Sequence, residues 1–319
     1  MIDVNPASAL ITAVPPQAPA SPFDLSRGDT YWRWLSSKLE HYPENAEQLI
    51  VEIRDPSALS RAERDAVIER CRKTNMAIYV CAAKYAYDKK RVQALGEQLG
   101  LRHMDSNLCA DADSISSVRV MPASQHHEYI PYSNHALNWH TDGYYNPPAQ
   151  RIRAFILHCA SAAAHGGDNA LLDPEIVYLL LRNENADHVR ALMQPDAMHI
   201  PANMKAGEEI RSACTGPVFA VDDATASLHM RYSARRQYIR WKADAATAAA
   251  VRFLQNMLTG SSRYVFHHCL EAGQGIICNN VLHSRTAFVN DPAGHRERLL
   301  YRARYYDRIV GTFAKPESA

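Results

Sequence analysis

One short motif in this chain places an imidazole next to a carboxylate: His140-Thr141-Asp142, with Gly143 directly after it. Side chains at positions i and i+2 of a β-strand lie on the same face, so we expect His140 and Asp142 to point together into one cavity. Gly143 would then let the chain turn sharply. With one further histidine, the pair would complete a two-histidine, one-carboxylate set, which binds Fe(II) and leaves coordination positions open.

The pattern His-x-Asp/Glu occurs, among other places, at His103–Asp105, His126–Glu128 and His140–Asp142. With 15 histidines and 34 acidic residues in 319 positions, about 1.6 such pairs are expected by chance, so context must choose among them. The first pair follows a helix stop and precedes a loop-like stretch. The second lies in a polar connection. We interpret both as structural or surface features, with the second also a candidate for lining an entrance.

Three further features follow His140–Asp142 along the chain. Gly166-Gly167 precedes the apolar run Asn169–Leu172, and two glycines allow a tight turn and a close approach of backbones. His283 lies at the end of an apolar strand. A turn then leads into a last strand that contains Arg298, 15 residues after His283.

In this order and spacing, His140-x-Asp142, Gly166-Gly167, His283 and Arg298 resemble the Fe(II)/2-oxoglutarate dioxygenases of the taurine dioxygenase (TauD/TfdA) superfamily. The resemblance covers about residues 118–306, and the segment 282–288 is most similar to the γ-butyrobetaine hydroxylase and clavaminate synthase branches. It implies a double-stranded β-helix (jelly-roll) core with helical insertions. It also implies that His140, Asp142 and His283 are iron ligands, and that Arg298 binds the far carboxylate of 2-oxoglutarate.

One position departs from the family pattern. Members often carry Thr or Ser directly after the Gly-Gly-acid run, where a hydroxyl helps to bind 2-oxoglutarate, and this chain has Asn169 there. An amide can also donate a hydrogen bond to a carboxylate, so we expect Asn169 to contact the cosubstrate.

The activity that the resemblance implies uses Fe(II), 2-oxoglutarate and O2, and it oxidises a small polar metabolite with release of succinate and CO2. The family's halogenases lack the carboxylate that this chain retains at Asp142, so hydroxylation or a related oxidation is favoured. Two alternatives remain: a hydrolase that binds Zn(II) with the same ligands, and an inactive binding protein on the same fold. Arg298 argues against the hydrolase, which needs no clamp for a carboxylate.

Strict alternation places Arg298, Arg302 and Arg304 on one face of the last strand. Three buried arginines need partners. We consider three explanations, in decreasing order of preference. The strand leaves the core after Tyr301, a bulge reverses the facing, or one extra arginine contacts an anionic substrate. Arg296 or Arg302 is the alternative residue for the 2-oxoglutarate role.

Less in the sequence bears on the substrate. Tyr144 and Tyr145 follow the metal pair and are candidates for the wall of the site. Arg231, in a basic and aromatic stretch, is a candidate for contacting a carboxylate, phosphonate or sulfonate. A pocket lined by tyrosines would instead suit a quaternary ammonium group through cation–π contacts.

The order of elements predicts the fold class α+β or mainly β. Residues 1–26 read as an extended Pro-rich arm, and 27–319 as a single dioxygenase domain. Within it we expect a mixed αβ part (27–117), a jelly-roll core with helical insertions (118–306) and a tail (307–319). Order should begin near Asp29.

The bulk composition excludes several classes of partner. The formal net charge is +1, which argues against nucleic acid or an anionic membrane surface as a partner. The apolar runs are shorter than the roughly 18–20 residues of a spanning helix. No secretory signal is visible, and seven cysteines without a CxxC pair read as reduced thiols. We therefore expect a cytoplasmic enzyme that binds a small molecule and is a possible homo-oligomer.

Overall fold

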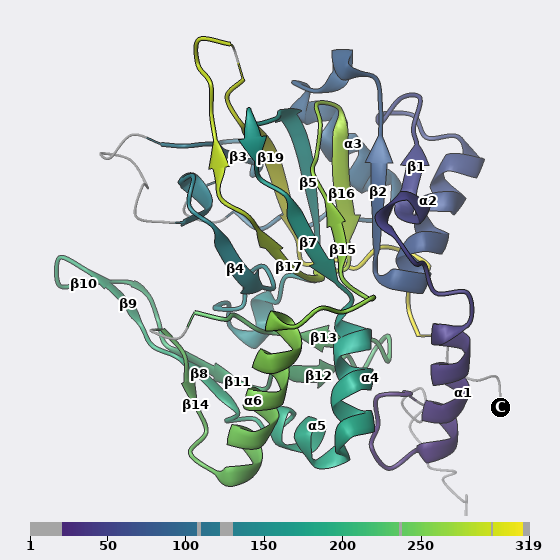
Figure 1. The fold of residues 1–319 in the computed structure, drawn as a ribbon, viewed down its shortest axis with the longest axis vertical. Helices are drawn as coiled ribbons and strands as arrows, with labels where there is room; N and C mark the ends of the chain where they lie inside the picture. Colours follow the sequence, from purple (N-terminus) through teal and green to yellow (C-terminus); the bar gives the residue numbers. More distant parts are fainter. Residues whose placement is uncertain (1–20, 107–109, 122–129, 236–237, 295, 315–319) are drawn as a thin grey trace, which may run out of the picture.

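Two β-sheets lie face to face at the centre of the molecule (Figure 1), in a computed structural model that describes residues 21–106, 110–121, 130–235, 238–294 and 296–314. The larger sheet contains, in spatial order, β1 (Ile50–Glu52), β2 (Met76–Val80), β16 (Gln274–Cys278), β5 (Ala154–Ser161), β19 (Leu299–Tyr305) and β3 (Ser116–Val118). The smaller sheet contains β15 (Phe266–His268), β7 (Asn169–Leu172), β17 (Leu282–Arg285) and β4 (Leu137–His140). Apart from the parallel pair β1–β2, the neighbours in both sheets are antiparallel.

The space between the two sheets is filled by side chains from both. Phe155 and Leu157 of β5 pack there with Leu171 of β7, Phe266 of β15 and Leu300 of β19. Each of these residues alternates with one that faces the other way, as the two-residue period of a strand requires. The predicted jelly-roll core is confirmed, and this apolar layer is what holds the smaller sheet at a fixed height over the larger one.

Helices cover the outer face of the larger sheet. α2 (Arg61–Thr74) and α3 (Lys89–Gln98) bury an apolar stripe against the second set of strand side chains, which includes Ile156 and Ala303. α2 begins with a capping box, in which Ser60 and Glu63 each bond the backbone N–H of the other. β1 and β2 extend the same sheet as β5 and β19, so the N-terminal αβ part and the core share one sheet.

A second group of elements lies beyond one end of the sheets (Figure 1). It is built around the helices α1 (Gly28–Leu39), α4 (Pro174–Glu184), α5 (Ala186–Leu192) and α6 (Ala245–Thr259). Short strands accompany them: β8 (Met198–Ile200), β11 (Cys214–Gly216), β14 (Arg240–Trp241), β12 (Phe219–Val221) and β13 (Leu228–Met230). The hairpin β9 (Asn203–Lys205) and β10 (Glu208–Arg211) projects away from the body of the molecule. The remaining short elements are β6 (His165–Gly166), β18 (Phe288–Val289), η1 (Ala46–Leu49), η2 (Ala83–Tyr85), η3 (Ile130–Tyr132) and η4 (Pro148–Gln150).

The N-terminal arm differs from the expectation at its described end. Residues 1–20 lie outside the described part of the chain, and Ser21 is already buried, ahead of the start that was expected near Asp29. Phe23 is fully buried, and its carbonyl accepts a hydrogen bond from Tyr178 of α4 at 3.0 Å. Phe23 and the hydrogen bonds of Ser21 and Pro22 thus anchor the described end of the arm.

Two further expectations concern membranes and cysteines. Among the described helices, none combines the length and the apolar character needed to cross a membrane. The described cysteines are all free thiols, and Cys109 lies outside the described residues.

His158 of β5 gives the fold a testable dependence on pH. Its Nε2 donates to the carbonyl of Ala86 at 3.1 Å, so its Nδ1 accepts from the Tyr79 hydroxyl at 2.8 Å. Burial lowers the pKa of His158 from 6.5 to about 4. Between these two values the unfolded chain takes up a proton that the folded chain does not, so the free energy of unfolding should fall as pH decreases from 6.5 towards 4.

We expect His158→Gln to make this decline shallower by up to about one proton per molecule. The measurement is urea unfolding at a series of pH values, with His267→Gln, which removes an exposed imidazole of β15, as the matched control. Equal slopes for the wild type and the His158 variant would contradict the assignment.

Candidate metal centre and active site

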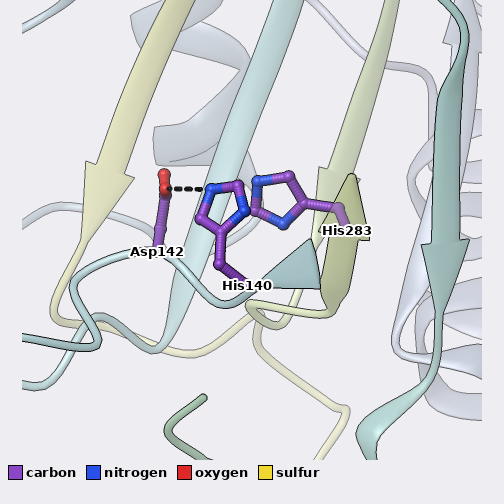
Figure 2. Close-up of side chains that lie close together, drawn as sticks. All are labelled: His140, Asp142 and His283. Carbon is purple, nitrogen blue, oxygen red and sulfur yellow. Dashed lines mark ion pairs between the residues drawn. The ribbon is translucent and has the colours of Figure 1, made fainter. Parts of the chain in front are cut away.

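The pairing of β4 with β17 brings two histidines together. His140, the last residue of β4, is the direct partner of His283 in β17, and their ring centroids lie 4.1 Å apart. Both side chains are buried and lie side by side (Figure 2). Residues directly opposite on one face of an antiparallel pair have Cβ atoms about 4.5–5.5 Å apart. The register of these two strands is therefore what places both imidazoles within reach of one ion.

The backbone fixes which nitrogen each histidine offers. His140 Nδ1 bonds the carbonyl of Asn138 at 2.8 Å, and His283 Nδ1 bonds the carbonyl of Val281 at 3.0 Å. A carbonyl only accepts, so each Nδ1 carries the proton and each neutral ring is left with a free lone pair on Nε2. A metal-binding histidine is usually held in this way, by a hydrogen bond from the ring nitrogen that does not bind the metal.

Asp142 also lies beside the two histidines, but it is held by a turn and not by the strand that was expected. β4 ends at His140, and residues 142–145 form a turn, so the argument from one strand face does not hold beyond His140. The carboxylate is nevertheless beside the imidazoles, with Oδ1 3.8 Å from His140 Nε2 (Figure 2). Its Oδ2 is buried without a hydrogen-bond partner. One ligand atom from each of His140, Asp142 and His283 lies within 4.8 Å of the others.

Two residues hold the turn that carries Asp142. Gly143 has φ +63°, and a Cβ there would lie 2.4 Å from Ile152 Cγ1, so the sharp turn depends on glycine as expected. Asn280, three residues before His283, accepts from the backbone N–H of Asp142 at 2.8 Å and donates to its carbonyl at 3.0 Å. The buried amide of Asn280 thus ties the Asp142 turn to the strand of His283, a role that nothing in the sequence had indicated beyond its place just before that strand.

The electrostatics of the three side chains suit a cation. Burial lowers the pKa of His140 to about 3, and the neighbouring His283 adds to this shift. Burial also lowers the pKa of His283. Burial raises the pKa of Asp142, but Arg302 and Arg304 outweigh it and hold the pKa of this carboxyl well below its usual value. Two neutral imidazoles and one carboxylate are the protonation states that metal binding requires.

Arg298 lies in the interior and is buried. Its guanidinium carbon is 5.0 Å from the ring centroid of Phe288, and a Cβ added at Gly167 would lie 3.4 Å from its Nε. Burial lowers the pKa of Arg298 to about 10, and only Cys159 and Cys269 oppose the shift. No described carboxylate pairs with it. A buried guanidinium without an anion is a cationic site that a carboxylate can occupy in two charge-assisted hydrogen bonds.

Asn169 of β7 is buried and faces the interior. Its strand neighbour in β17 is Arg285, and it lies on the same face as Leu171, whose partner is His283. Its amide nitrogen donates to the carbonyl of His268 at 3.3 Å. The side chain therefore already has one hydrogen-bond partner, and a contact with 2-oxoglutarate stays a prediction.

The two arginines of β19, Arg302 and Arg304, face inward, and both have carboxylate partners. β19 continues to Tyr305, so the first explanation, that the strand leaves the core after Tyr301, is wrong. The register does shift between Leu299 and Leu300, but Arg302 and Arg304 lie opposite Leu157 and Phe155 of the interior layer. Arg302 Nη1 is 3.5 Å from Asp142 Oδ1. Arg304 is ion-paired with Asp105 and donates to the Tyr145 hydroxyl at 3.0 Å.

The pairs His103–Asp105 and His126–Glu128 can now be compared with this arrangement. In the first pair, His103 bonds Asp307 at 2.8 Å while Asp105 partners Arg304, so the two side chains have separate tasks. Asp105 also lines the cavity beside the metal ligands. Its structural role fits the expectation, but its position in the site was not foreseen. The second pair, His126–Glu128, lies outside the described residues.

A cavity of about 370 Å³ is lined by His140 and Asp142 of the three clustered residues. Tyr144 and Tyr145 both line it, with their rings edge to face at 5.2 Å. Arg231 does not line it. Its guanidinium donates to the carbonyls of Met198 and Gly216 and lies near Cys214, so it stabilises the short strands around β8. Two cavity arginines, Arg211 and Arg235, were not singled out as site residues in the sequence.

Comparison of the sequence with known protein families identifies the family of this chain. The model of the taurine catabolism dioxygenase TauD, TfdA family matches residues 38–304. The chain belongs to this family. Its membership confirms the resemblance to the TauD/TfdA superfamily and the predicted dioxygenase class.

Two curated relatives are named uridine-5'-phosphate dioxygenase. One, from Amycolatopsis sp, is 29% identical over 195 residues, covering 60% of this chain and 67% of the relative. The other, from Streptomyces sp, is 26% identical over 231 residues, covering 70% and 81%.

Solved structures with the same fold include an asparagine oxygenase in complex with Fe(II), 3-hydroxyasparagine and succinate. It has a TM-score of 0.56 at 16% identity, covering 91% of this chain and 86% of that chain. Another is the non-haem iron oxygenase OrfP with Fe, succinate and a dihydroxyarginine, with a TM-score of 0.58 at 14% identity, covering 78% and 82%. These likenesses support the jelly-roll assignment.

Asn280 offers a test of how the site is positioned. Asn280→Ala would leave the backbone N–H and carbonyl of Asp142 without their side-chain partner, while no metal-binding atom is removed. We expect divalent-metal affinity to fall roughly 10- to 100-fold and stability to fall by about 1–3 kcal/mol. Calorimetric titration with Fe(II) or Co(II) and urea unfolding measure the two effects. Unchanged metal affinity in a destabilised variant would show that Asn280 does not position the carboxylate.

Proposed function

We propose that His140, Asp142 and His283 bind Fe(II), and that Arg298 binds the far carboxylate of 2-oxoglutarate, with Asn169 as a second polar contact. The observation that carries the proposal is the convergence of two free Nε2 atoms and one unpartnered carboxylate oxygen in a buried site. Two histidines and one carboxylate are the ligand set of non-haem Fe(II) oxygenases. Arg298 supports it further, because its buried charge has no described carboxylate partner.

As a member of the TauD/TfdA family, the enzyme uses Fe(II), 2-oxoglutarate and O2. When bound, these groups supply the oxidising power, and succinate and CO2 are released as the substrate is oxidised. The chain's own residues bind and aim them. Asn138 and Val281 fix the imidazole tautomers through their carbonyls, and Asn280 holds the carboxylate in place. Burial between the sheets keeps bulk water away from the ligands.

The alternatives of a zinc hydrolase and an inactive binding protein find less support. A hydrolase would use the same three ligands to activate water. It would have no use for a buried guanidinium positioned for a second carboxylate, and the family is one of dioxygenases. The complete ligand set argues against a protein that has lost its activity.

The primary substrate is a small molecule that fits the cavity of about 370 Å³. Because both curated relatives are named uridine-5'-phosphate dioxygenases, uridine 5'-phosphate is the first compound to test as substrate. Tyr144 and Tyr145 are the residues we propose as the wall against which the substrate packs.

The metal assignment is tested without any substrate. Under anaerobic conditions, wild-type protein with Fe(II) and 2-oxoglutarate should develop a metal-to-ligand charge-transfer band. His140→Ala should abolish both the band and turnover, because it removes one of the two imidazole ligands of the candidate site. His165→Ala, which removes an exposed histidine at the start of β6, should leave the band intact. A wild-type protein that gave no band would contradict the proposal.

The role of Arg298 is tested through the cosubstrate. Arg298→Gln should raise the concentration of 2-oxoglutarate needed for half-maximal band formation by at least tenfold, since a charge-assisted bidentate contact is lost. Fe(II) affinity in the absence of 2-oxoglutarate should change little. Arg296→Gln is the matched control, because Arg296 is exposed and donates to the carbonyl of Ala163. If the Arg296 variant alone showed the defect, the two assignments would have to be exchanged.

A further inference from the structure

The wall of the cavity beside His140 and Asp142 contains more arginines than aspartates. Its described lining includes four arginines, Arg211, Arg235, Arg302 and Arg304, against two aspartates, Asp105 and Asp142. The other described lining residues carry no charge in this count, and they include His140, whose Nδ1–H donates to the carbonyl of Asn138 and whose Nε2 is left for the metal. The described wall thus has an excess of two positive charges around a space of about 370 Å³.

Loading the site does not remove this excess. A divalent metal adds two positive charges and 2-oxoglutarate adds two negative charges, while Arg298, which would bind the cosubstrate, is not part of this cavity wall. The structural ion pairs account for two arginines, since Arg302 pairs with Asp142 and Arg304 pairs with Asp105. The uncompensated charge therefore belongs to Arg211 and Arg235.

These two arginines come from separate segments and pair with no described carboxylate. Arg211, at the end of β10, donates to the carbonyls of Ser212 and Pro201, which leave its charge in place. Its guanidinium carbon is 5.5 Å from the ring centroid of Tyr145. Arg235 follows β13, and its guanidinium carbon lies 5.3 Å from the ring centroid of Tyr238. Both are partly exposed at the wall of the cavity.

We propose that the primary substrate carries a dianionic group, a phosphomonoester, which Arg211 and Arg235 bind at the wall of this cavity. A phosphomonoester has a charge of about −1.5 to −2 at neutral pH and three strong acceptor oxygens, so it matches two guanidinium groups in charge and can accept hydrogen bonds from them. A carboxylate or sulfonate would cancel only half of the excess. This inference rests on the proposed function, because it counts the charges of the metal and 2-oxoglutarate.

The rest of the lining indicates what is attached to the phosphate. Tyr144 and Tyr145 offer aromatic surface, while Asn138, Gln150 and Asn203 offer amide groups. A flat ring with polar edges would find both stacking and hydrogen-bond partners there. The anion would lie at the wall, and the part to be oxidised would face His140 and Asp142.

Binding of the anion would also affect the hairpin β9–β10. It projects from the body of the molecule (Figure 1) and brings Asn203, Ile210 and Arg211 to the cavity. A phosphate bound by Arg211 would connect this hairpin to the segment that carries Arg235. Amide hydrogen exchange in residues 203–211 should slow when the anion binds.

The test compares three probes with the same ring: phenyl phosphate, benzenesulfonate and phenol. Each is titrated by calorimetry into protein loaded anaerobically with Fe(II) and 2-oxoglutarate. We expect phenyl phosphate to bind at least tenfold more tightly than benzenesulfonate, and phenol not to bind measurably. Equal affinity for the phosphate and the sulfonate would overturn the proposal of a dianion.

The variants Arg211→Gln and Arg235→Gln should each weaken binding of phenyl phosphate at least tenfold. Arg240→Gln, which removes an exposed arginine of β14 outside the cavity lining, should leave the affinity unchanged. Undiminished affinity in both cavity variants would overturn the assignment of the two residues.

Failure of this inference and failure of the proposed function can be told apart. All three variants should keep the charge-transfer band with Fe(II) and 2-oxoglutarate, since none of these arginines belongs to the metal or cosubstrate site. A normal band with no preference for phosphate refutes the anion site alone. A missing band in the wild-type protein refutes the metal site, and calorimetry on the metal-free protein then still reports on the arginines.

Discussion

The register between β4 and β17 is the constraint on which the active site depends. It places His140 opposite His283, although the two residues lie far apart in the sequence. A shift of one residue would turn one imidazole to the other face of the sheet. The register is secured by the layer between the sheets, where Leu171 lies next to His283 in β7 and Phe155 faces it from β5 at a ring-centroid distance of 4.8 Å. The apolar core therefore determines the geometry of a polar site.

Asp142 joins this frame through backbone hydrogen bonds rather than through a strand. The buried Asn280 bonds both the N–H and the carbonyl of Asp142, and also the carbonyl of Ile152. A turn fixed in this way keeps its carboxylate in place while one oxygen remains free of protein partners. The site combines a rigid pair of strands with a short turn that is tied to them, which is a common way to give a loop residue the precision of a sheet.

The inward arginines of β19 show how one strand can serve structure and binding together. Arg304 pairs with Asp105, and Arg302 pairs with the candidate ligand Asp142. A buried charge is costly unless it is paired, so these partners explain how the strand tolerates the charges. Arg298 lacks such a partner among the described residues, which is what makes it suited to a carboxylate that arrives with the cosubstrate. The same reasoning separates Arg211 and Arg235 from the other cavity arginines.

The sequence alone determined the local elements and the identity of the clustered residues. The strand Asn169–Leu172 has the predicted bounds, because the period of apolar residues and the turn residues beside them act over a few positions. The motif identified His140, Asp142 and His283, because it depends only on residue types and their spacing. Gly143 likewise predicted the turn, since glycine adopts a positive φ without strain.

Only the tertiary structure decided how charged and polar side chains are paired. Asp105 contacts Arg304, and Asn280 supports Asp142, although the members of each pair are distant in sequence. The end of β4 at His140 was likewise not visible in the sequence. For the same reason Arg231, in a basic stretch, proved to bind backbone carbonyls, while Arg211 on a hairpin reached the cavity. Local periodicity follows from neighbouring residues, whereas the partner of a buried charge depends on strand register and packing across the whole chain.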